Sequence, residues 1–360
     1  MPDIVLTSSV FGEVKIAEPV GICYLGAIAR QHGYSVEFLE PSLAGWSSEQ
    51  TAEIVLRRPS ALLGVSMLRD EQKTDVLAFL STLRRAGDDR FIVVGGHAPS
   101  VAIMTGVEDI VPPYEGRSRS SARGDCLGVQ QGLSGCAAHP DSARQGCYYA
   151  DLARYCNAFM LGECDLSFPM VVDAVLGKKP WRHLPGVAYM GPEGSFVINP
   201  PGAKTRDLDA LPFMARDTLE SYLERFPGSV AAAVCFGRGC HYACTFCTVA
   251  AFQALQSGPR HRQRSAGNVV EEIRQLHDRY GISVFNFEDD NFIVRSRSGV
   301  AKIRQLCAAI RELPFDITFS IFCRADAVEE GLFQGLKRAG LKTIYLGVFD
   351  ILKGNQSAGF

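Results

Sequence analysis

The chain has 360 residues, of which 47% are hydrophobic, 21% charged and 9% aromatic, a composition typical of a globular protein with enough apolar side chains for two domains. Its 37 basic and 39 acidic residues give a formal net charge of −2, so nothing points to nucleic acid or an anionic membrane as the main partner. We find neither an apolar run long enough to span a bilayer nor the basic start of a signal peptide in residues 1–6, and we therefore expect a cytoplasmic protein.

Strands and helices alternate through the first hundred residues. The predicted elements are strands at residues 3–11, 35–41, 61–68 and 91–94, and helices at residues 22–33, 48–58 and 71–86. Alternation at this spacing gives right-handed β-α-β units and a parallel sheet. The sequence therefore predicts a doubly wound, Rossmann-like α/β domain, which we extend over residues 1–200.

The regular pattern breaks at residues 105–155, which are rich in Gly, Ser, Arg and Cys and lack periodicity. We interpret this stretch as an irregular insertion. Its Cys126, Cys136 and Cys147 lie ten and eleven residues apart, a spacing that fits no metal-ligand pattern.

The α/β pattern resumes after the insertion with a strand at residues 157–163 and a helix at 165–176. Residues 185–189 and 196–199 predict a small hairpin. Several prolines then favour a linker over residues 201–228.

A second α/β series fills residues 229–360. Its predicted elements are strands at residues 230–236, 283–288, 317–322 and 343–348, and helices at residues 266–280, 297–312 and 328–339. Repeated β-α steps of this kind build barrels. We therefore expect a partial β/α barrel with four such steps.

The chain contains 12 cysteines, and four of them fall between residues 235 and 247. Without a secretion signal, metal binding or burial explains them better than disulfides. Cys240, Cys244 and Cys247 form a C-x3-C-x2-C motif directly after a predicted strand. Three thiolates at this spacing can hold an iron–sulfur cluster and leave one iron open to a small molecule. A zinc site with Cys235 or His241 as a fourth ligand is the alternative, and three buried cysteines without metal are another.

Residues 240–247, CHYACTFC, resemble the C-x3-C-x-aromatic-C signature of radical S-adenosylmethionine (SAM) enzymes, with Phe246 at the aromatic position. The resemblance continues through residues 264–273, 285–292, 324–326 and 345–348. It implies that Cys240, Cys244 and Cys247 bind a [4Fe–4S] cluster whose open iron is chelated by S-adenosylmethionine.

The acidic turn after the second barrel strand lies where barrel active sites are found. There Glu288, Asp289 and Asp290 would contact polar groups of S-adenosylmethionine or order the loop, unless they are simply a solvated turn. Arg324, at the end of the third strand, would pair with the methionine carboxylate of that cofactor.

The order of a doubly wound domain, a linker and a radical SAM barrel resembles the cobalamin-dependent branch of this family. The matching residues include 19–21, 64–66, 95–100 and 161–163. Ligands of open α/β sheets bind beyond the carboxyl ends of the strands, and the resemblance makes the ligand there cobalamin. We expect Ser66, Gly95 and Gly96 to contact it, because they follow strands and glycine allows close backbone approach.

The chain contains no D-x-H-x-x-G motif, so we do not predict cobalt ligation by a histidine of this domain. The alternative is a domain that binds nothing or serves only for docking. Family members usually have six β-α units, whereas only about four fit here, and we interpret the barrel as truncated.

The resemblance implies a methyltransferase that acts at an unactivated carbon. A 5′-deoxyadenosyl radical would remove a hydrogen atom from the substrate, and the substrate radical would take a methyl group from methylcobalamin. The alternatives are a non-methylating rearrangement or cyclisation, or an inactive partner subunit. The implied partners are a small-molecule or peptide substrate, which the sequence does not identify, and a reductant protein such as flavodoxin or ferredoxin.

Overall fold

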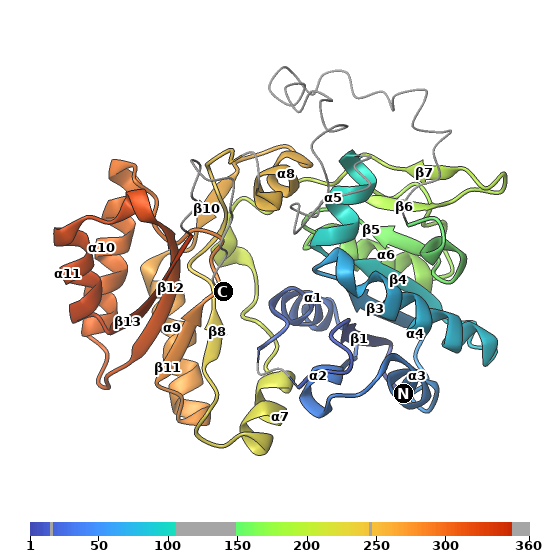
Figure 1. Ribbon diagram of the computed structural model, residues 1–360, viewed down its shortest axis with the longest axis horizontal. Helices are drawn as coiled ribbons and strands as arrows, with labels where there is room; N and C mark the ends of the chain where they lie inside the picture. Colours follow the sequence, from blue (N-terminus) through green and yellow to red (C-terminus); the bar gives the residue numbers. More distant parts are fainter. Residues whose placement is uncertain (15–16, 106–148, 245–246, 348–360) are drawn as a thin grey trace, which may run out of the picture.

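The computed structural model describes residues 1–14, 17–105, 149–244 and 247–347. Within these ranges the chain forms two α/β halves that lie side by side, drawn in blue to green and in yellow to red in Figure 1. The predicted fold class is confirmed, since a mainly parallel doubly wound sheet is followed by a smaller parallel sheet of the barrel type. Phe246 and Cys126, Cys136 and Cys147 of the predicted insertion lie outside the described residues.

The N-terminal half is built on a seven-stranded sheet in the order β2-β1-β3-β4-β5-β6-β7. Its strands are β1 (Ile4–Ser8), β2 (Val36–Leu39), β3 (Leu62–Ser66), β4 (Phe91–Gly95), β5 (Ala158–Met160), β6 (Val187–Met190) and β7 (Phe196–Ile198). The first five are parallel, and β6 and β7 are the antiparallel pair that the sequence predicts as a hairpin. The strand order reverses between β1 and β3, which is where open α/β sheets bind ligands.

Helices cover both faces of this sheet. They are α1 (Val20–Gln31), α2 (Pro41–Ala44), α3 (Ser48–Leu56), α4 (Lys73–Arg85), α5 (His97–Thr105) and α6 (Ser167–Leu176). Because side chains alternate along a strand, Val5 packs in the cluster on one face, whereas Ile4 and Leu6 pack in the cluster on the other. Both clusters exclude water, so the sheet is a rigid base for the loops at its carboxyl edge.

The C-terminal half contains a four-stranded parallel sheet in the order β13-β12-β11-β8. Its elements are β8 (Ala232–Val234), β11 (Val284–Phe287), β12 (Thr318–Arg324), β13 (Leu341–Gly347), α9 (Ala266–Tyr280), α10 (Arg297–Arg311) and α11 (Glu330–Arg338). Phe285, Phe287 and Phe319 are buried between this sheet and its helices.

Besides α2 and α5, four short helices and strands were not predicted from the sequence. They are α7 (Asp217–Arg225), β9 (Gly237–Gly239), α8 (Thr248–Ala254) and β10 (His261–Gln263). The three-residue strands β9 and β10 form an antiparallel ribbon, and α8 has only seven residues. Elements this short depend on tertiary contacts, because helix nucleation is unfavourable in isolation.

The two halves share an apolar cluster. Cys23 and Tyr24 of α1 pack there against Met214 of the connecting segment and against Ala233 and Cys235 of the C-terminal half. In Figure 1, α1 accordingly lies on the side of the first sheet that faces β8. The contact fixes the position of β8 relative to the first sheet.

A buried chain of ion pairs runs beside this cluster. Glu18 accepts hydrogen bonds from Arg216 at 2.8 Å and from the backbone N–H of Ala233 at 2.7 Å. Arg216 also pairs with Glu272, which in turn pairs with Arg264. Removing one member of such a chain would leave a buried charge without its partner, which is strongly destabilising.

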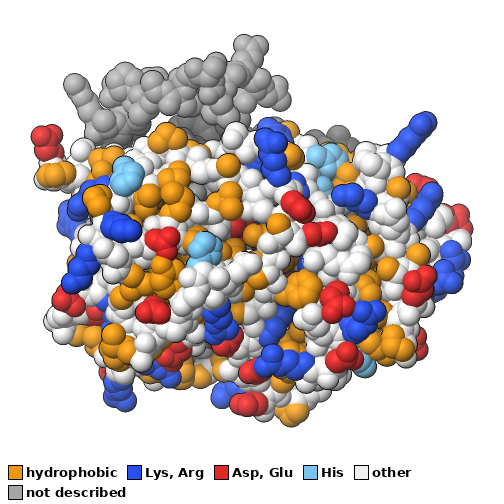
Figure 2. All heavy atoms as spheres, turned by 180° about the vertical axis from the view of Figure 1, so that it is seen from behind, with side chains coloured by type: hydrophobic (Ala, Val, Ile, Leu, Met, Phe, Trp, Pro, Cys, Tyr) orange, Lys and Arg blue, Asp and Glu red, His pale blue; other side chains and the backbone are white. Residues whose placement is uncertain are grey.

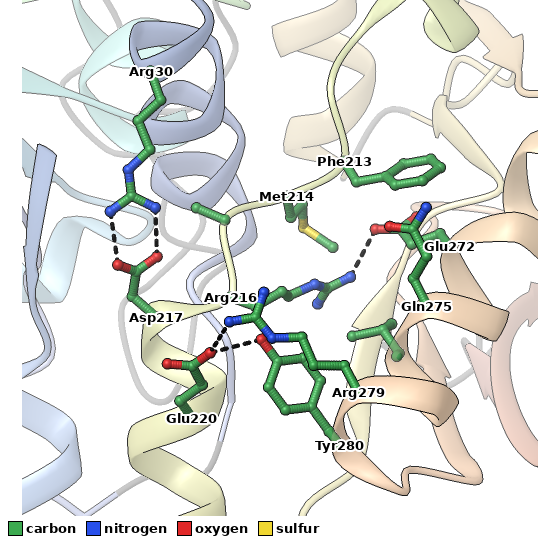
Figure 3. Close-up of a pocket in the computed structure, with 12 residues that line it drawn as sticks. Arg30, Phe213, Met214, Arg216, Asp217, Glu220, Glu272, Gln275, Arg279 and Tyr280 are labelled. Atoms are coloured by element: carbon green, nitrogen blue, oxygen red, sulfur yellow. Dashed lines mark hydrogen bonds and ion pairs between the residues drawn. The ribbon is translucent and has the colours of Figure 1, made fainter. Parts of the chain in front are cut away.

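A cavity of about 330 Å³ lies next to this chain of ion pairs, between α1, α7 and α9 (Figure 3). Arg30 pairs with Asp217, and Arg279 pairs with Glu220, both at 2.7 Å. Each arginine in this view thus has a carboxylate partner, and we interpret the cavity as part of the junction between the halves. The pairs at its rim are solvent-exposed and contribute little to stability.

On the face shown in Figure 2, basic and acidic side chains are interspersed. No helix among the described residues is both long enough and apolar enough to cross a bilayer.

Gly96 allows a close backbone approach that alanine would block. Its φ is +114°, and a Cβ there would lie 2.3 Å from the carbonyl oxygen of Met67. Gly87 also has a positive φ, of +82°, but a Cβ there would meet no atom within 4 Å. We expect Gly87→Ala to lower the free energy of unfolding by about 1–2 kcal/mol through backbone strain alone, and Gly96→Ala to lower it clearly more.

Urea denaturation of the two variants measures this difference. Equal losses of stability in both variants would contradict the predicted steric conflict at Gly96.

Candidate functional site

A cavity of about 320 Å³ lies between the carboxyl edge of the N-terminal sheet and the C-terminal half. Ser66, Gly95 and Gly96 line one wall, as expected for residues at the ends of β3 and β4. Glu288 and Asp290 line the opposite wall. The structure thus brings the N-terminal candidates and the acidic turn to one cavity, whose volume is in the range of ligand-binding sites.

The turn from β4 into α5 shapes the first wall. The positive φ of Gly96 lets the chain turn tightly against Met67, and His97 follows at the start of α5. The His97 ring stacks on Phe252 of α8, with ring centroids 4.8 Å apart. This contact joins the glycine turn of one half to a helix of the other.

The three candidate cluster cysteines lie on the segment between β9 and α8. All are half-buried, and Cys247 is the N-cap of α8. Burial is the main cause that raises the pKa of the Cys240 thiol. Arg324 donates a hydrogen bond from Nη1 to Sγ of Cys244 at 3.1 Å.

In the part of the chain that the structure describes, no three His, Cys, Asp or Glu side chains converge on a point where a single metal ion would bind. Cys235, one possible fourth zinc ligand, packs in the apolar cluster between the halves, where burial raises the pKa of its thiol. The described side chains are therefore not arranged as a zinc site. A [4Fe–4S] cluster is larger than a single ion and its thiolates bind to different irons, so the three cysteines remain the predicted cluster ligands.

Asp289 holds the start of β9, just before the cysteine segment. Asp289 is 3% exposed, and its carboxyl group accepts hydrogen bonds from the backbone N–H groups of Phe236 and Gly237. Asp290 accepts one from Gly239 at 3.1 Å. Of the two roles considered for this turn, the contacts of Asp289 support ordering of the loop.

Burial disfavours the charged forms of these acids. It raises the pKa of Asp289 to about 8 and that of Asp290 to about 6, although the backbone hydrogen bonds oppose the shift. Burial also raises the pKa of Glu288, which faces the cavity. A polar group of a bound ligand would meet Glu288 directly.

Arg324 lies at the end of β12, as predicted. Its guanidinium pairs with Asp326 at 2.9 Å and covers the ring of Tyr242 at 4.0 Å, in addition to its contact with Cys244. It is thus next to the cysteines, and its predicted pairing with a methionine carboxylate stays a prediction.

Sequence reasoning missed two ion pairs that join the N-terminal half to the β9–β10 ribbon beside the cavity. Asp165 pairs with Arg238 at 2.7 Å, and Glu163 pairs with Arg262 at 2.5 Å. The partners are 73 and 99 residues apart, so no local spacing could indicate them. The only signal was the presence of Glu163 among the residues matched by resemblance.

The profile of the radical SAM superfamily matches residues 234–351. The C-terminal half is a radical SAM domain. This match begins in β8 and includes the cysteine segment, the acidic turn and Arg324.

Curated relatives match the chain at identities below 30%. An uncharacterized methyltransferase of Pyrococcus horikoshii is 28% identical over 192 residues, which cover 53% of this chain and 40% of that protein. The cytidylyl-2-hydroxyethylphosphonate methyltransferase of Streptomyces wedmorensis is 24% identical over 327 residues, which cover 82% of this chain and 54% of that protein. The chain thus spans about half of the length of these relatives.

The fold resembles that of TsrM from Kitasatospora setae, a radical SAM methyltransferase. One structure of TsrM, with tryptophan and a SAM analog bound, matches 97% of this chain and 60% of TsrM with a TM-score of 0.68 and 16% identity. Another holds cobalamin and a [4Fe–4S] cluster and matches with a TM-score of 0.67 and 15% identity. These comparisons confirm the predicted resemblance to cobalamin-dependent radical SAM enzymes.

Asp289 makes stability depend on pH. The folded protein keeps a proton on Asp289 up to about pH 8, whereas the unfolded chain loses it near the ordinary aspartate pKa of 3.8. Between these values the folded state binds more protons, so the contribution of Asp289 is complete at low pH and is lost as the pH rises. We expect the stability advantage of the wild type over Asp289→Asn to shrink from about pH 5 to about pH 8.

Urea denaturation of the iron-free proteins at both pH values measures this change. An advantage that stays constant with pH would contradict the raised pKa.

Proposed function

We propose that this chain is a radical SAM enzyme with a [4Fe–4S] cluster and a cobalamin-binding domain, and that it methylates an unactivated carbon. The observation that carries the proposal is the shared cavity, which Ser66, Gly95 and Gly96 line on one side and Glu288 and Asp290 on the other. A site for a methyl donor and a site for radical formation would then open into the same space.

When bound, S-adenosylmethionine on the reduced cluster supplies a 5′-deoxyadenosyl radical, and methylcobalamin supplies the methyl group. Cys240, Cys244 and Cys247 would hold the cluster, with Phe246 at the aromatic position of the motif. Arg324 would hold Cys244 in place through its hydrogen bond to Sγ, and Glu288 would bind a polar group of S-adenosylmethionine. Asp289 would keep the strand before the cysteines in place.

The apolar side chains that line the cavity would exclude water and other hydrogen donors from a reactive radical. The substrate would be a small molecule or a peptide that enters the same cavity. An electron would come from a reductant protein such as a flavodoxin or a ferredoxin.

The cysteine motif gives the first test. We expect the triple variant Cys240→Ala/Cys244→Ala/Cys247→Ala to lose nearly all of about four bound irons per chain, because cysteine thiolates hold the cluster. Iron analysis and the visible spectrum after anaerobic reconstitution measure the loss. The matched control is Cys235→Ala, which removes a buried thiol of the apolar cluster and should keep its iron. Iron that stays bound to the triple variant would refute the cluster assignment.

The second test fills the cavity on its N-terminal wall. We expect Ser66→Phe to reduce corrinoid binding by at least about tenfold, because the ring would occupy space that the ligand needs. Ser66→Ala keeps the cavity open and should bind corrinoid like the wild type. The corrinoid absorbance retained after anaerobic gel filtration measures binding, and iron content should be the same in all three proteins. Equal corrinoid binding by Ser66→Phe would place the ligand elsewhere.

A further inference from the structure

The segment Gly162–Asp165 follows β5 and lies against both ends of the cysteine segment. Glu163 of this segment pairs with Arg262 of β10, the strand hydrogen-bonded to β9 just before Cys240. Gln253 and Gln256 contact the same segment from α8 and the residues after it, beyond Cys247. One short stretch of the N-terminal half thus contacts the chain on both sides of the three cysteines.

The contact with Arg262 is a bidentate ion pair. Nη2 of Arg262 donates to Oε1 of Glu163 at 2.5 Å, and Nη1 donates to Oε2 at 2.9 Å. The two side chains are only 4% and 9% exposed. Arg262 lies opposite Arg238 in the β9–β10 ribbon, and Arg238 pairs with Asp165. Two neighbouring carboxylates of the N-terminal half therefore hold both strands of the ribbon.

The contacts with the other end of the cysteine segment use the backbone of Glu163 as well as its side chain. The amide oxygen of Gln256 accepts from the N–H of Glu163 at 2.6 Å, and the amide nitrogen donates to the carbonyl of Glu163 at 3.1 Å. Gln253, at 3.4 Å from the Glu163 carboxylate, adds a weaker contact. Both glutamines are buried.

Gly162 makes this approach possible. Its φ is +79°, and a Cβ at this position would lie 2.6 Å from the amide group of Gln256. A larger residue would displace the amide group of Gln256. Glycine thus allows the backbone of one half to reach the side chain of the other.

Helix α8 has seven residues, too few to be stable without tertiary contacts. Its N-cap is Cys247, so the contacts that hold α8 also set where this thiol lies. The stacking of His97 on Phe252 is a further contact of the N-terminal half with α8. Gly162, Glu163 and His97 all line the cavity as well.

We propose that Glu163 is a positioning residue. It holds the cysteine segment, and with it the cluster, in a fixed position relative to the cavity between the halves. This role rests on the proposed function, because Glu163 can position a cluster only if the cysteines bind one. Glu163 does not touch the reacting atoms. It acts through Arg262 and Gln256 on the two ends of the segment.

The first arm of the test uses the full-length, iron-free protein and does not depend on the cluster. In Glu163→Gln, amide hydrogen exchange in residues 237–239 and 248–256 should speed up by about tenfold or more, since a buried arginine loses its charged partner. Exchange in β1 and β11 should stay as in the wild type. The matched control is Glu37→Gln, which removes a solvent-exposed pair with Arg58 and should leave exchange in the cysteine segment unchanged.

The second arm uses anaerobically reconstituted protein. Glu163→Gln should retain the iron content of the wild type, but the EPR spectrum of its reduced cluster with S-adenosylmethionine should differ from that of Glu37→Gln. Arg262→Lys keeps the charge but loses the bidentate geometry, and it should show the same changes in weaker form. If Glu163→Gln does not fold, Arg262→Lys decides by the same two measurements.

Exchange that is unchanged, or faster throughout the protein, together with an EPR spectrum like that of the control, would overturn the positioning role. A wild-type protein that binds no cluster would instead refute the proposed function, and the exchange measurement would still report on the contact.

Discussion

This structure depends on ion pairs between the two halves. In these pairs, buried carboxylates of the N-terminal half bind arginines of the connecting segment and of the C-terminal half. Glu18 binds Arg216, Glu163 binds Arg262, and Asp165 binds Arg238. Each carboxylate is at most 9% exposed, so its charge requires the arginine that faces it. Such pairs are poor sources of stability compared with apolar packing, but separating the partners would leave buried charges unpaired. Here that arrangement puts the carboxyl edge of the first sheet opposite the cysteine segment, with the cavity between them.

A second set of acidic side chains acts within the C-terminal half. Asp289 and Asp290 bind backbone N–H groups of residues 236, 237 and 239, immediately before the cysteines. The path of the chain into the cysteine segment is thus fixed by acids of its own half, and β9 is fixed in addition by Asp165 through Arg238. The cluster would then bind to a segment whose two ends are already held, which reduces the conformational entropy that binding must overcome.

The fold was predictable from the sequence because its signals are local. Alternating apolar strands and amphipathic helices indicated the doubly wound sheet and the barrel strands, and Ser66, Gly95 and Gly96 were placed at strand ends and line the cavity. The cysteine trio was visible as a spacing. The ribbon β9–β10 and helix α8 were not predictable, because elements of three to seven residues have too little periodicity. The pairing of Glu163 with Arg262 spans 99 residues and depends on how the two halves meet, which no local pattern encodes.

We infer that both cofactors would open into one cavity between the halves. The most direct test is the EPR signal of cob(II)alamin bound to the anaerobically reconstituted protein, recorded with the cluster oxidised and then reduced. A shared cavity predicts that reduction of the cluster broadens or splits the cob(II)alamin signal through coupling of two nearby spins. A cob(II)alamin signal that is identical in both states, with full occupancy of corrinoid and iron, would contradict the claim.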